Sequence, residues 1–282
     1  MGSSKIMLVT GANKGIGLAI TRGLCKLPGD NVVYLGSRNE ERGKKAVQLL
    51  EGEGLTPRLL LIDIDDEDSV KAARDFISAT HGGLSVLVNN AGIAFKHDSK
   101  ASFGEQAAVT VRTNYYGTQR VCNLMFPLLR PGARVVNVSS SCGKLSMIDG
   151  NDCQALREKF RDPQLTEAGL DKLMEDFIEL AKDSKEAATK AGYPKNTYKV
   201  SKVGVSALTI IQQREMDRER GGEDIAINHV HPGYVDTDMT SHKGSLTIDE
   251  GASSSLFAAT LPPGTDIRGE YIWQDCSVVK WD

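Results

Sequence analysis

Short apolar segments alternate with longer segments of helical periodicity along nearly the whole of this chain. Seven apolar segments are predicted to be strands: residues 6–10, 31–36, 58–62, 85–89, 134–138, 226–231 and 270–274. Stretches between them have the spacing of amphipathic helices, for example residues 16–27, 40–53, 67–80 and 105–129. Apolar strands that alternate with helices are typical of a parallel sheet covered on both faces. The sequence therefore predicts an α/β fold, a single Rossmann-like doubly wound parallel sheet of about seven strands.

One long segment departs from this alternation. Residues 145–192 contain no predicted strand, are rich in Lys, Glu and Asp, and show an amphipathic pattern from Leu170 to Ala181. We expect a helical insertion whose apolar stripe packs on the rest of the protein, although a helix that docks a partner is compatible with the same pattern. No Pro/Gly/Ser-rich linker and no internal repeat divides the chain, so residues 1–282 are expected to form one domain.

Charge and cysteine usage exclude several classes of partner. The formal net charge of -3 argues against nucleic acid or an anionic membrane as the main partner. No apolar segment approaches the length of a membrane span. The five cysteines are scattered without a Cys-x-x-Cys pair, which favours a reduced, cytoplasmic protein over a disulfide framework or a zinc site. His229 and His231 alternate on a predicted strand, where packing or lining a ligand site is favoured over binding a metal.

A glycine-rich turn joins the first predicted strand to the helix that follows it. The sequence TGANKGIG at 10–17 spaces Gly11, Gly15 and Gly17 as G-x-x-x-G-x-G. Glycines permit a tight turn and let backbone N–H groups approach a phosphate at the positive end of a helix. At the first strand-to-helix junction of an α/β chain, this turn favours a bound dinucleotide.

The end of the second predicted strand distinguishes between the two nicotinamide cofactors. A NAD site usually has an acidic residue about 20 positions beyond the glycine-rich turn, whereas Ser37 and Arg38 stand there in this chain. A hydroxyl and a guanidinium suit a 2′-phosphate, and Lys14 supplies a second cation, so NADP(H) is favoured. Asp63 at the end of the third strand could accept from the adenine amino group. Asn90, after the fourth strand, is expected both to hold that strand end and to line the cleft.

Tyr198 and Lys202 lie four positions apart in a segment of helical periodicity, so their side chains share a face. A nearby ammonium favours the phenolate, and we therefore expect Lys202 to lower the tyrosine pKa from its usual value of about 10. Such a tyrosine can donate or accept a proton at neutral pH, as carbonyl reduction or alcohol oxidation requires. Taken alone, the pair is also compatible with a half-buried aromatic beside a solvated lysine.

Five motifs occur in a fixed order along nearly the whole chain. They are TGANKGIG at 10–17, NNAG at 89–92, NVSS at 137–140, YKVSK at 198–202 and HPGYVDTDM at 231–239. In this set and order the chain resembles the short-chain dehydrogenase/reductase family. Within that family, the long segment before the tyrosine, together with TGANKGIGLAI and NNAGIAFK, is similar to the monomeric cytosolic carbonyl reductases.

The resemblance implies a catalytic role for four residues. Tyr198 would be the general acid that protonates the carbonyl oxygen, and Lys202 would lower its pKa and bind the nicotinamide ribose hydroxyls. Ser140 would hydrogen-bond the same carbonyl oxygen, with Ser139 as the alternative because three serines follow one another. Asn114 would hold a water that links Lys202 to solvent.

The resemblance also implies contacts to NADPH at the ends of several strands. No metal ligands are expected, because neither the histidines nor the cysteines have metal-binding spacing. The residues expected to flank the nicotinamide are Pro232, Gly233, Val235 and Thr237. The remaining expected contacts are Gly11, Asn13, Lys14, Gly15, Ile16, Gly17, Arg38, Asp63, Ile64 and Asn90.

Together, these residues predict NADPH-dependent reduction of ketones, aldehydes or quinones by hydride transfer, with tyrosine as the acid. The expected pocket wall, from residues 93–96, 141–145, 234–239 and the insertion, mixes apolar and aromatic groups and indicates lipophilic small-molecule substrates. A dehydrogenase specific for a hydroxysteroid or prostanoid-like alcohol is one alternative, and a non-catalytic nucleotide-sensing scaffold is another. In the resembling reductases such an insertion covers helices that otherwise form a subunit interface, so a monomer is expected.

Overall fold

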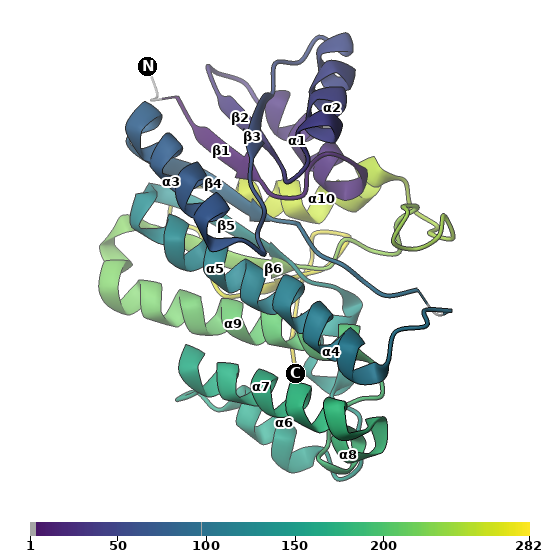
Figure 1. The fold of residues 1–282 in the computed structure, drawn as a ribbon. Helices are drawn as coiled ribbons and strands as arrows, with labels where there is room; N and C mark the ends of the chain where they lie inside the picture. Colours follow the sequence, from purple (N-terminus) through teal and green to yellow (C-terminus); the bar gives the residue numbers. More distant parts are fainter. Residues whose placement is uncertain (1–3, 97) are drawn as a thin grey trace.

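The computed structural model describes residues 4–96 and 98–282 of the chain (Figure 1). Within these residues, eight strands form one sheet in the order β3-β2-β1-β4-β5-β6-β7-β8. The strands are Ile6–Val9 (β1), Val32–Ser37 (β2), Arg58–Leu61 (β3), Leu84–Asn89 (β4), Leu129–Val138 (β5), Ala226–Val230 (β6), Tyr271–Ile272 (β7) and Val278–Val279 (β8). All neighbouring strands are parallel except β7 and β8. The predicted doubly wound parallel sheet is therefore confirmed.

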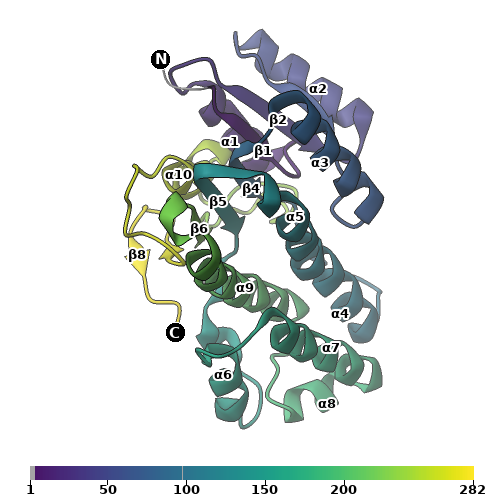
Figure 2. The ribbon, with the colours of Figure 1, turned by 90° about the vertical axis from the view of Figure 1, so that its left-hand side faces the viewer.

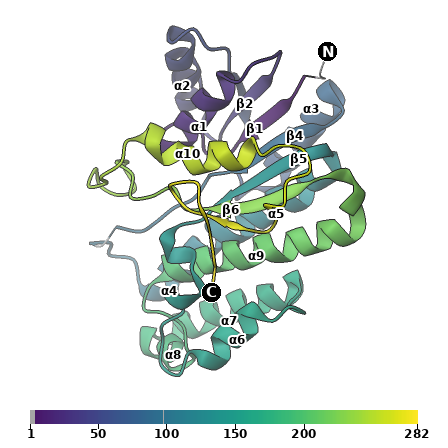
Figure 3. The ribbon, with the colours of Figure 1, turned by 180° about the vertical axis from the view of Figure 1, so that it is seen from behind.

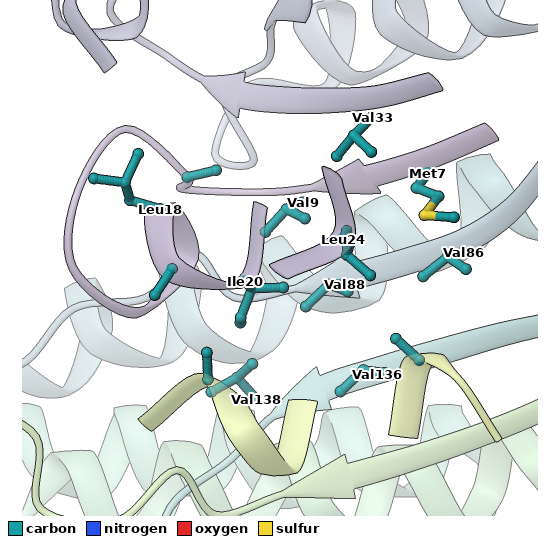
Figure 4. Close-up of a cluster of buried hydrophobic side chains, with 14 of the residues drawn as sticks. Met7, Val9, Leu18, Ile20, Leu24, Val33, Val86, Val88, Val136 and Val138 are labelled. Carbon is teal, nitrogen blue, oxygen red and sulfur yellow. The ribbon is translucent and has the colours of Figure 1, made fainter. Parts of the chain in front are cut away.

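Helices cover both faces of the sheet. The chain adds strands outward from β1 on one side and then from β4 on the other side. The α-helices outside the insertion are Gly15–Cys25 (α1), Glu40–Gly52 (α2), Glu67–His81 (α3), Phe103–Val111 (α4), Gly117–Met125 (α5), Thr197–Arg220 (α9) and Ile248–Ala259 (α10). α1 and α10 lie on one face (Figure 3), and α3 and α5 lie on the other (Figure 1). Two apolar cores result, one on each face of the sheet. In the first, Val9, Val88 and Val136 point toward α1 and α10 (Figure 4).

The prediction of one continuous α-helix over 105–129 is wrong in two places, at the middle of the segment and at its end. A π-helical turn, Arg112–Tyr116 (η1), separates α4 from α5, and a 3₁₀ turn at Phe126–Leu128 follows α5. Pro127 lies in that turn and has no N–H to donate, so the α-helix ends before it. β5 then begins at Leu129, five residues earlier than predicted. The antiparallel β8, with only two residues, was not predicted because so short a segment shows no periodicity.

The insertion forms three helices, Gln154–Arg161 (α6), Glu167–Asp183 (α7) and Lys185–Lys190 (α8), as expected from its pattern. They lie together at one end of the molecule, beyond α4 and α9 (Figure 2). Leu170, Met174 and Phe177 of α7 are fully buried in a third apolar core with residues of α4 and α9. The amphipathic stripe therefore packs on the rest of the protein. In the described part of the chain, no helix combines the length and apolar character needed to cross a bilayer.

Candidate active site

Tyr198 and Lys202 lie one turn apart near the start of α9. Asn196 caps this helix, because its side chain accepts from the Lys199 N–H. The Lys202 ammonium nitrogen lies 5.7 Å from the centre of the Tyr198 ring. It donates to the Val138 carbonyl at 2.7 Å, within an almost completely buried environment. The pair therefore faces the carboxyl end of β5, where ligands of open α/β sheets bind.

The two serines that follow β5 have different surroundings. Ser139 is buried, and its hydroxyl bonds to the Lys202 carbonyl at 3.2 Å and to the Ser206 hydroxyl at 2.8 Å. Ser140 is partly exposed, and its hydroxyl accepts from the Cys142 N–H at 3.2 Å and acts to lower the pKa of Tyr198. Strand alternation thus turns one hydroxyl into the core and the next toward the tyrosine. This arrangement supports Ser140 as the serine that meets a substrate.

Burial dominates the acid–base chemistry of this pair. It raises the pKa of Tyr198 to about 12, against the smaller effect of the Ser140 hydroxyl. It lowers the pKa of Lys202 to about 8. The expected lowering of the Tyr198 pKa by Lys202 is not found, because desolvation disfavours the charged form of both groups. A tyrosine that keeps its proton at neutral pH suits a general acid.

Asn114 lies on the π-helical turn η1 and joins the loop after β4 to α9. Its amide oxygen accepts from the Ile93 N–H at 2.8 Å, and its amide nitrogen donates to the Ser201 hydroxyl at 3.0 Å. A methyl group built on Gly92 would lie 3.2 Å from the Asn114 amide oxygen and 3.6 Å from the Lys202 nitrogen. Asn114 and Lys202 thus lie on either side of Gly92. The role of Asn114 in holding a water stays a prediction.

The glycine-rich turn packs closely against the end of β4. Gly11 has a φ of +61°, and a Cβ there would lie 2.8 Å from the Cα of Ala91. A Cβ on Gly17 would lie 2.4 Å from the side-chain nitrogen of Asn90, which itself donates to the Gly11 carbonyl at 3.1 Å. Only glycine fits in these places. Asn90 holds the turn through the Thr10 and Gly11 carbonyls, and its contact with the cofactor stays a prediction.

The segment after β6 lies beside the glycine-rich turn. A Cβ on Gly15 would lie 3.4 Å from the methyl carbon of Thr237. The Lys14 ammonium pairs with Asp238 at 2.5 Å on an exposed surface. The fold thus brings the start of α1, where a phosphate is expected, next to the segment with the four expected nicotinamide contacts. Ile16 and Asn13, on the same turn, are partly exposed.

At the end of β2 only one of the two expected phosphate contacts is accessible. Ser37 is 1% exposed, and its hydroxyl donates to the Asn39 carbonyl at 2.9 Å. The expectation that this hydroxyl meets a 2′-phosphate is therefore wrong, because it is used within the turn. Arg38 is exposed, and among residues 4–96 and 98–282 no carboxylate lies within ion-pair distance of it. Arg38 is therefore available to an anion at this end of β2.

Asp63, expected beside the adenine, and Ile64, another expected NADPH contact, follow β3. The side chain of Asp63 accepts from the Asp65 N–H at 3.1 Å and is partly exposed. Ile64 is buried against Gly117 of α5, at a distance of 2.8 Å from a Cβ built there. Asp63 is therefore better placed than Ile64 to reach a ligand.

Sequence reasoning missed the residues that surround the turn after Ser140. The Tyr271 hydroxyl donates to the Ser140 carbonyl, and the Trp281 ring nitrogen donates to the Gly143 carbonyl at 2.6 Å. His231, which was expected to be packed or to line a ligand site, is buried beside the same turn. Tyr271 and Trp281 come more than a hundred positions after Ser140, and no motif in the sequence marks them.

Comparisons with known proteins agree with this geometry. Residues 5–151 match the family model described as short chain dehydrogenase. The chain is 46% identical over 280 residues to carbonyl reductase (NADPH) 3 of Mus musculus, with 99% of both proteins covered. It is 45% identical over 278 residues to carbonyl reductase (NADPH) 1 of Homo sapiens, with 98% of both covered. The structure of salutaridine reductase from Papaver somniferum aligns with a TM-score of 0.82 at 28% identity, over 96% of this chain and 100% of that one. The chain belongs to the short-chain dehydrogenase/reductase family.

Proposed function

We propose that this protein reduces the carbonyl group of ketones, aldehydes or quinones with NADPH. The observation that carries the proposal is the convergence of Ser140, Tyr198 and Lys202 at the end of β5, next to the glycine-rich turn. Full-length relatives at 45–46% identity carry the name carbonyl reductase (NADPH), which gives the substrate class and the cofactor.

The residues present fit NADPH. The start of α1 at Gly15 presents its backbone N–H groups to a pyrophosphate, and Gly11 lets the turn before it pack closely on Ala91. Arg38 is free to pair with the 2′-phosphate, and the segment from Pro232 to Thr237 borders the expected place of the nicotinamide. When bound, NADPH supplies the hydride that is added to the carbonyl carbon.

The side chains of this protein perform the remaining tasks of the reaction. The Ser140 hydroxyl donates a hydrogen bond to the carbonyl oxygen and stabilises the negative charge that develops on it. The Tyr198 hydroxyl delivers its proton to the same oxygen. The Lys202 ammonium, fixed by the Val138 carbonyl, binds the nicotinamide ribose hydroxyls beside the tyrosine.

The substitution Tyr198→Phe tests the proposal. It removes the acidic proton but keeps the ring, so we expect turnover of a reactive quinone or an α-dicarbonyl to fall by about 10²–10⁴-fold. NADPH binding, measured by calorimetry, should stay close to that of the unmodified protein. Tyr116→Phe is the matched control, because its hydroxyl contacts the Asp171 carbonyl on the insertion. Equal turnover in Y198F and the unmodified protein would refute the role of Tyr198.

We further propose that the protein is a cytoplasmic monomer whose 282 residues form one domain with an insertion. All five cysteines are free, which fits a reducing compartment. The insertion helices pack against α4 and α9 and bury apolar side chains on both. An apolar helix face that is covered in this way offers no surface for a second copy.

A further inference from the structure

We propose that His231 is a positioning residue, which fixes the catalytic Ser140 relative to the segment that borders the nicotinamide. This inference rests on the proposed function and assigns a task to a side chain outside the four-residue catalytic set. His231 directly follows β6, the strand that lies between β5 and β7 in the sheet. Only 7% of the residue is exposed.

One ring nitrogen of His231 joins two parts of the site. Nδ1 accepts from the Ser141 N–H at 2.9 Å and from the Gly233 N–H at 3.3 Å. Ser141 follows the catalytic serine directly, and Gly233 belongs to the turn after β6. A single acceptor thus links the turn that presents the Ser140 hydroxyl to the turn that borders the cofactor.

The peptide group between Ser140 and Ser141 is held at both ends. The Tyr271 hydroxyl donates to its carbonyl oxygen, and His231 accepts from its N–H. A peptide group is planar, so fixing both ends fixes the dihedral angle ψ of Ser140. The N–H of Ser139 donates to the Val230 carbonyl at 2.9 Å and anchors the chain one residue earlier. The backbone at Ser140 is therefore held from β6 and β7, while the Ser140 hydroxyl accepts from the Cys142 N–H at 3.2 Å within the turn.

The surroundings of His231 keep its Nδ1 available as an acceptor. Nδ1 can accept only while it carries no proton, so the proton of the neutral ring is on Nε2. Burial lowers the pKa of His231 to about 4, and the nearby Lys144 ammonium acts in the same direction. The ring of Trp273, at 4.3 Å between ring centres, restrains the imidazole from one side. An aliphatic side chain in this place would fill the space but would accept nothing.

Loss of this acceptor should affect the chemical step more than cofactor binding. The shorter of the two hydrogen bonds is to the serine turn, so losing the acceptor should affect that turn more than the turn after β6. A displacement of about 1 Å between reacting groups can lower a rate by about 10²-fold. The phosphate-binding turn lies on another strand and keeps its own contacts, so NADPH should still bind.

The experiment compares three substitutions of His231 that differ in what they can accept. H231L removes the acceptor, H231N replaces Nδ1 by an amide oxygen at similar reach, and H231Q places that oxygen one carbon farther away. His81→Leu is the control, because it removes an imidazole that bonds to the Tyr34 hydroxyl at 2.8 Å at the end of α3. Each variant is assayed for kcat, KM, NADPH affinity and thermal unfolding. The isotope effect on turnover is measured with NADPH that is deuterated at the transferred position.

We expect H231L to lower kcat by roughly 10- to 100-fold and to enlarge the isotope effect, because hydride transfer becomes the slow step. Its KM and NADPH affinity should change little, and H231N should recover most of the lost kcat. If H231L does not fold, the proposal still requires that H231N have a higher kcat than H231Q. Unchanged kcat and isotope effect in H231L, or equal losses in H231N and H231Q, would overturn the proposal. A wild-type protein without carbonyl turnover would instead refute the proposed function, so the two failures are distinguishable.

Discussion

At the residue scale, a row of polar side chains crosses four strands beneath the candidate active site. The sheet register pairs Asn89 with Asn137, Asn137 with His229, and His229 with Tyr271. Asn89 donates to Asn137 at 2.8 Å, and the His229 ring stacks on Tyr271 with 4.5 Å between ring centres. His229 is completely buried, and neither of its ring nitrogens has a partner among the described residues. Burial lowers its pKa to about 3, so the ring stays neutral at ordinary pH.

Because His229 and His231 resist protonation, we expect the protein to lose stability as the pH falls. Their pKa values in the folded protein, about 3 and about 4, lie below the usual 6.5. Between pH 6.5 and about 4 the unfolded chain therefore binds protons that the folded protein does not, and the free energy of unfolding decreases. Each histidine contributes a slope of up to ~1.4 kcal/mol per pH unit. Urea unfolding at several pH values from 6.5 to 5.5 measures the slope.

The substitution His229→Phe provides the control for this pH dependence. Phenylalanine keeps an aromatic ring against Tyr271 but binds no proton, so about half of the slope between pH 6.5 and 5.5 should disappear. A slope in H229F that equals that of the unmodified protein would show that other groups cause the acid sensitivity.

At the element scale, one carboxylate of the insertion connects α7 to the π-helical turn η1 and to α5. Asp171 accepts from the Tyr115 hydroxyl and from the Gln119 amide, each at 2.9 Å. Tyr115 is fully buried, and burial followed by the nearby Asp171 charge raises its pKa. The tyrosine therefore remains a hydrogen-bond donor, and its partner is a group of the insertion.

Asp171→Ala should therefore destabilise the protein by about 1–3 kcal/mol, because the buried Tyr115 hydroxyl loses its acceptor. Asp176→Ala on the same helix is the matched control. Asp176 pairs with Lys172 on the exposed side at 2.8 Å, and such a pair contributes about 0.3–0.5 kcal/mol. Chemical denaturation of both variants gives the comparison. Equal effects would mean that the insertion is not held through Asp171.

Elements with a strong local pattern could be predicted from the sequence, and those determined by distant contacts could not. The strands at 6–9 and 84–89 and the stripe of α7 were predicted because apolar side chains recur at the period of the element. The π-helical turn at Arg112–Tyr116 has no such signal, since its sequence is equally compatible with an α-helix. β8 depends on pairing with β7, and its two residues carry no periodicity.

The parts of the candidate site that come from one motif could be predicted from the sequence. Single residues that are distant in the chain could not. Tyr198 and Lys202 occupy one helix, so their spacing indicates their proximity. The position of Ser37 in the chain suggests a ligand contact. The sequence does not show that its hydroxyl is buried and bonded to the Asn39 carbonyl. Tyr271 lies beside the Ser140 turn because β5, β6 and β7 are neighbours in the sheet. This strand order cannot be read from the sequence.

At the scale of the whole molecule, three apolar cores account for the packing, two on the faces of the sheet and one under the insertion. The third core joins α7 to α4 and α9, which also carries Tyr198 and Lys202. The insertion is thus continuous with the helix that presents the candidate catalytic pair. We expect the protein to unfold as one cooperative unit.

We expect the protein to be a monomer in solution, because the insertion covers the apolar surfaces of α4 and α9. Light scattering coupled to size exclusion should give a mass near 30.5 kDa at every concentration tested. A stable species of about twice that mass would contradict the expectation. Deleting the insertion is the complementary measurement, since the exposed third core should then cause association.

The contact between Trp281 and the turn after Ser140 also has an optical consequence. The chain has two tryptophans, and the other, Trp273, lies against His231 beside the same turn. Nearly all of the intrinsic fluorescence excited at long ultraviolet wavelengths therefore originates next to the candidate active site. The protein thus carries its own spectroscopic reporter, and ligand binding or movement of the Ser140 turn can be followed in solution without an attached dye.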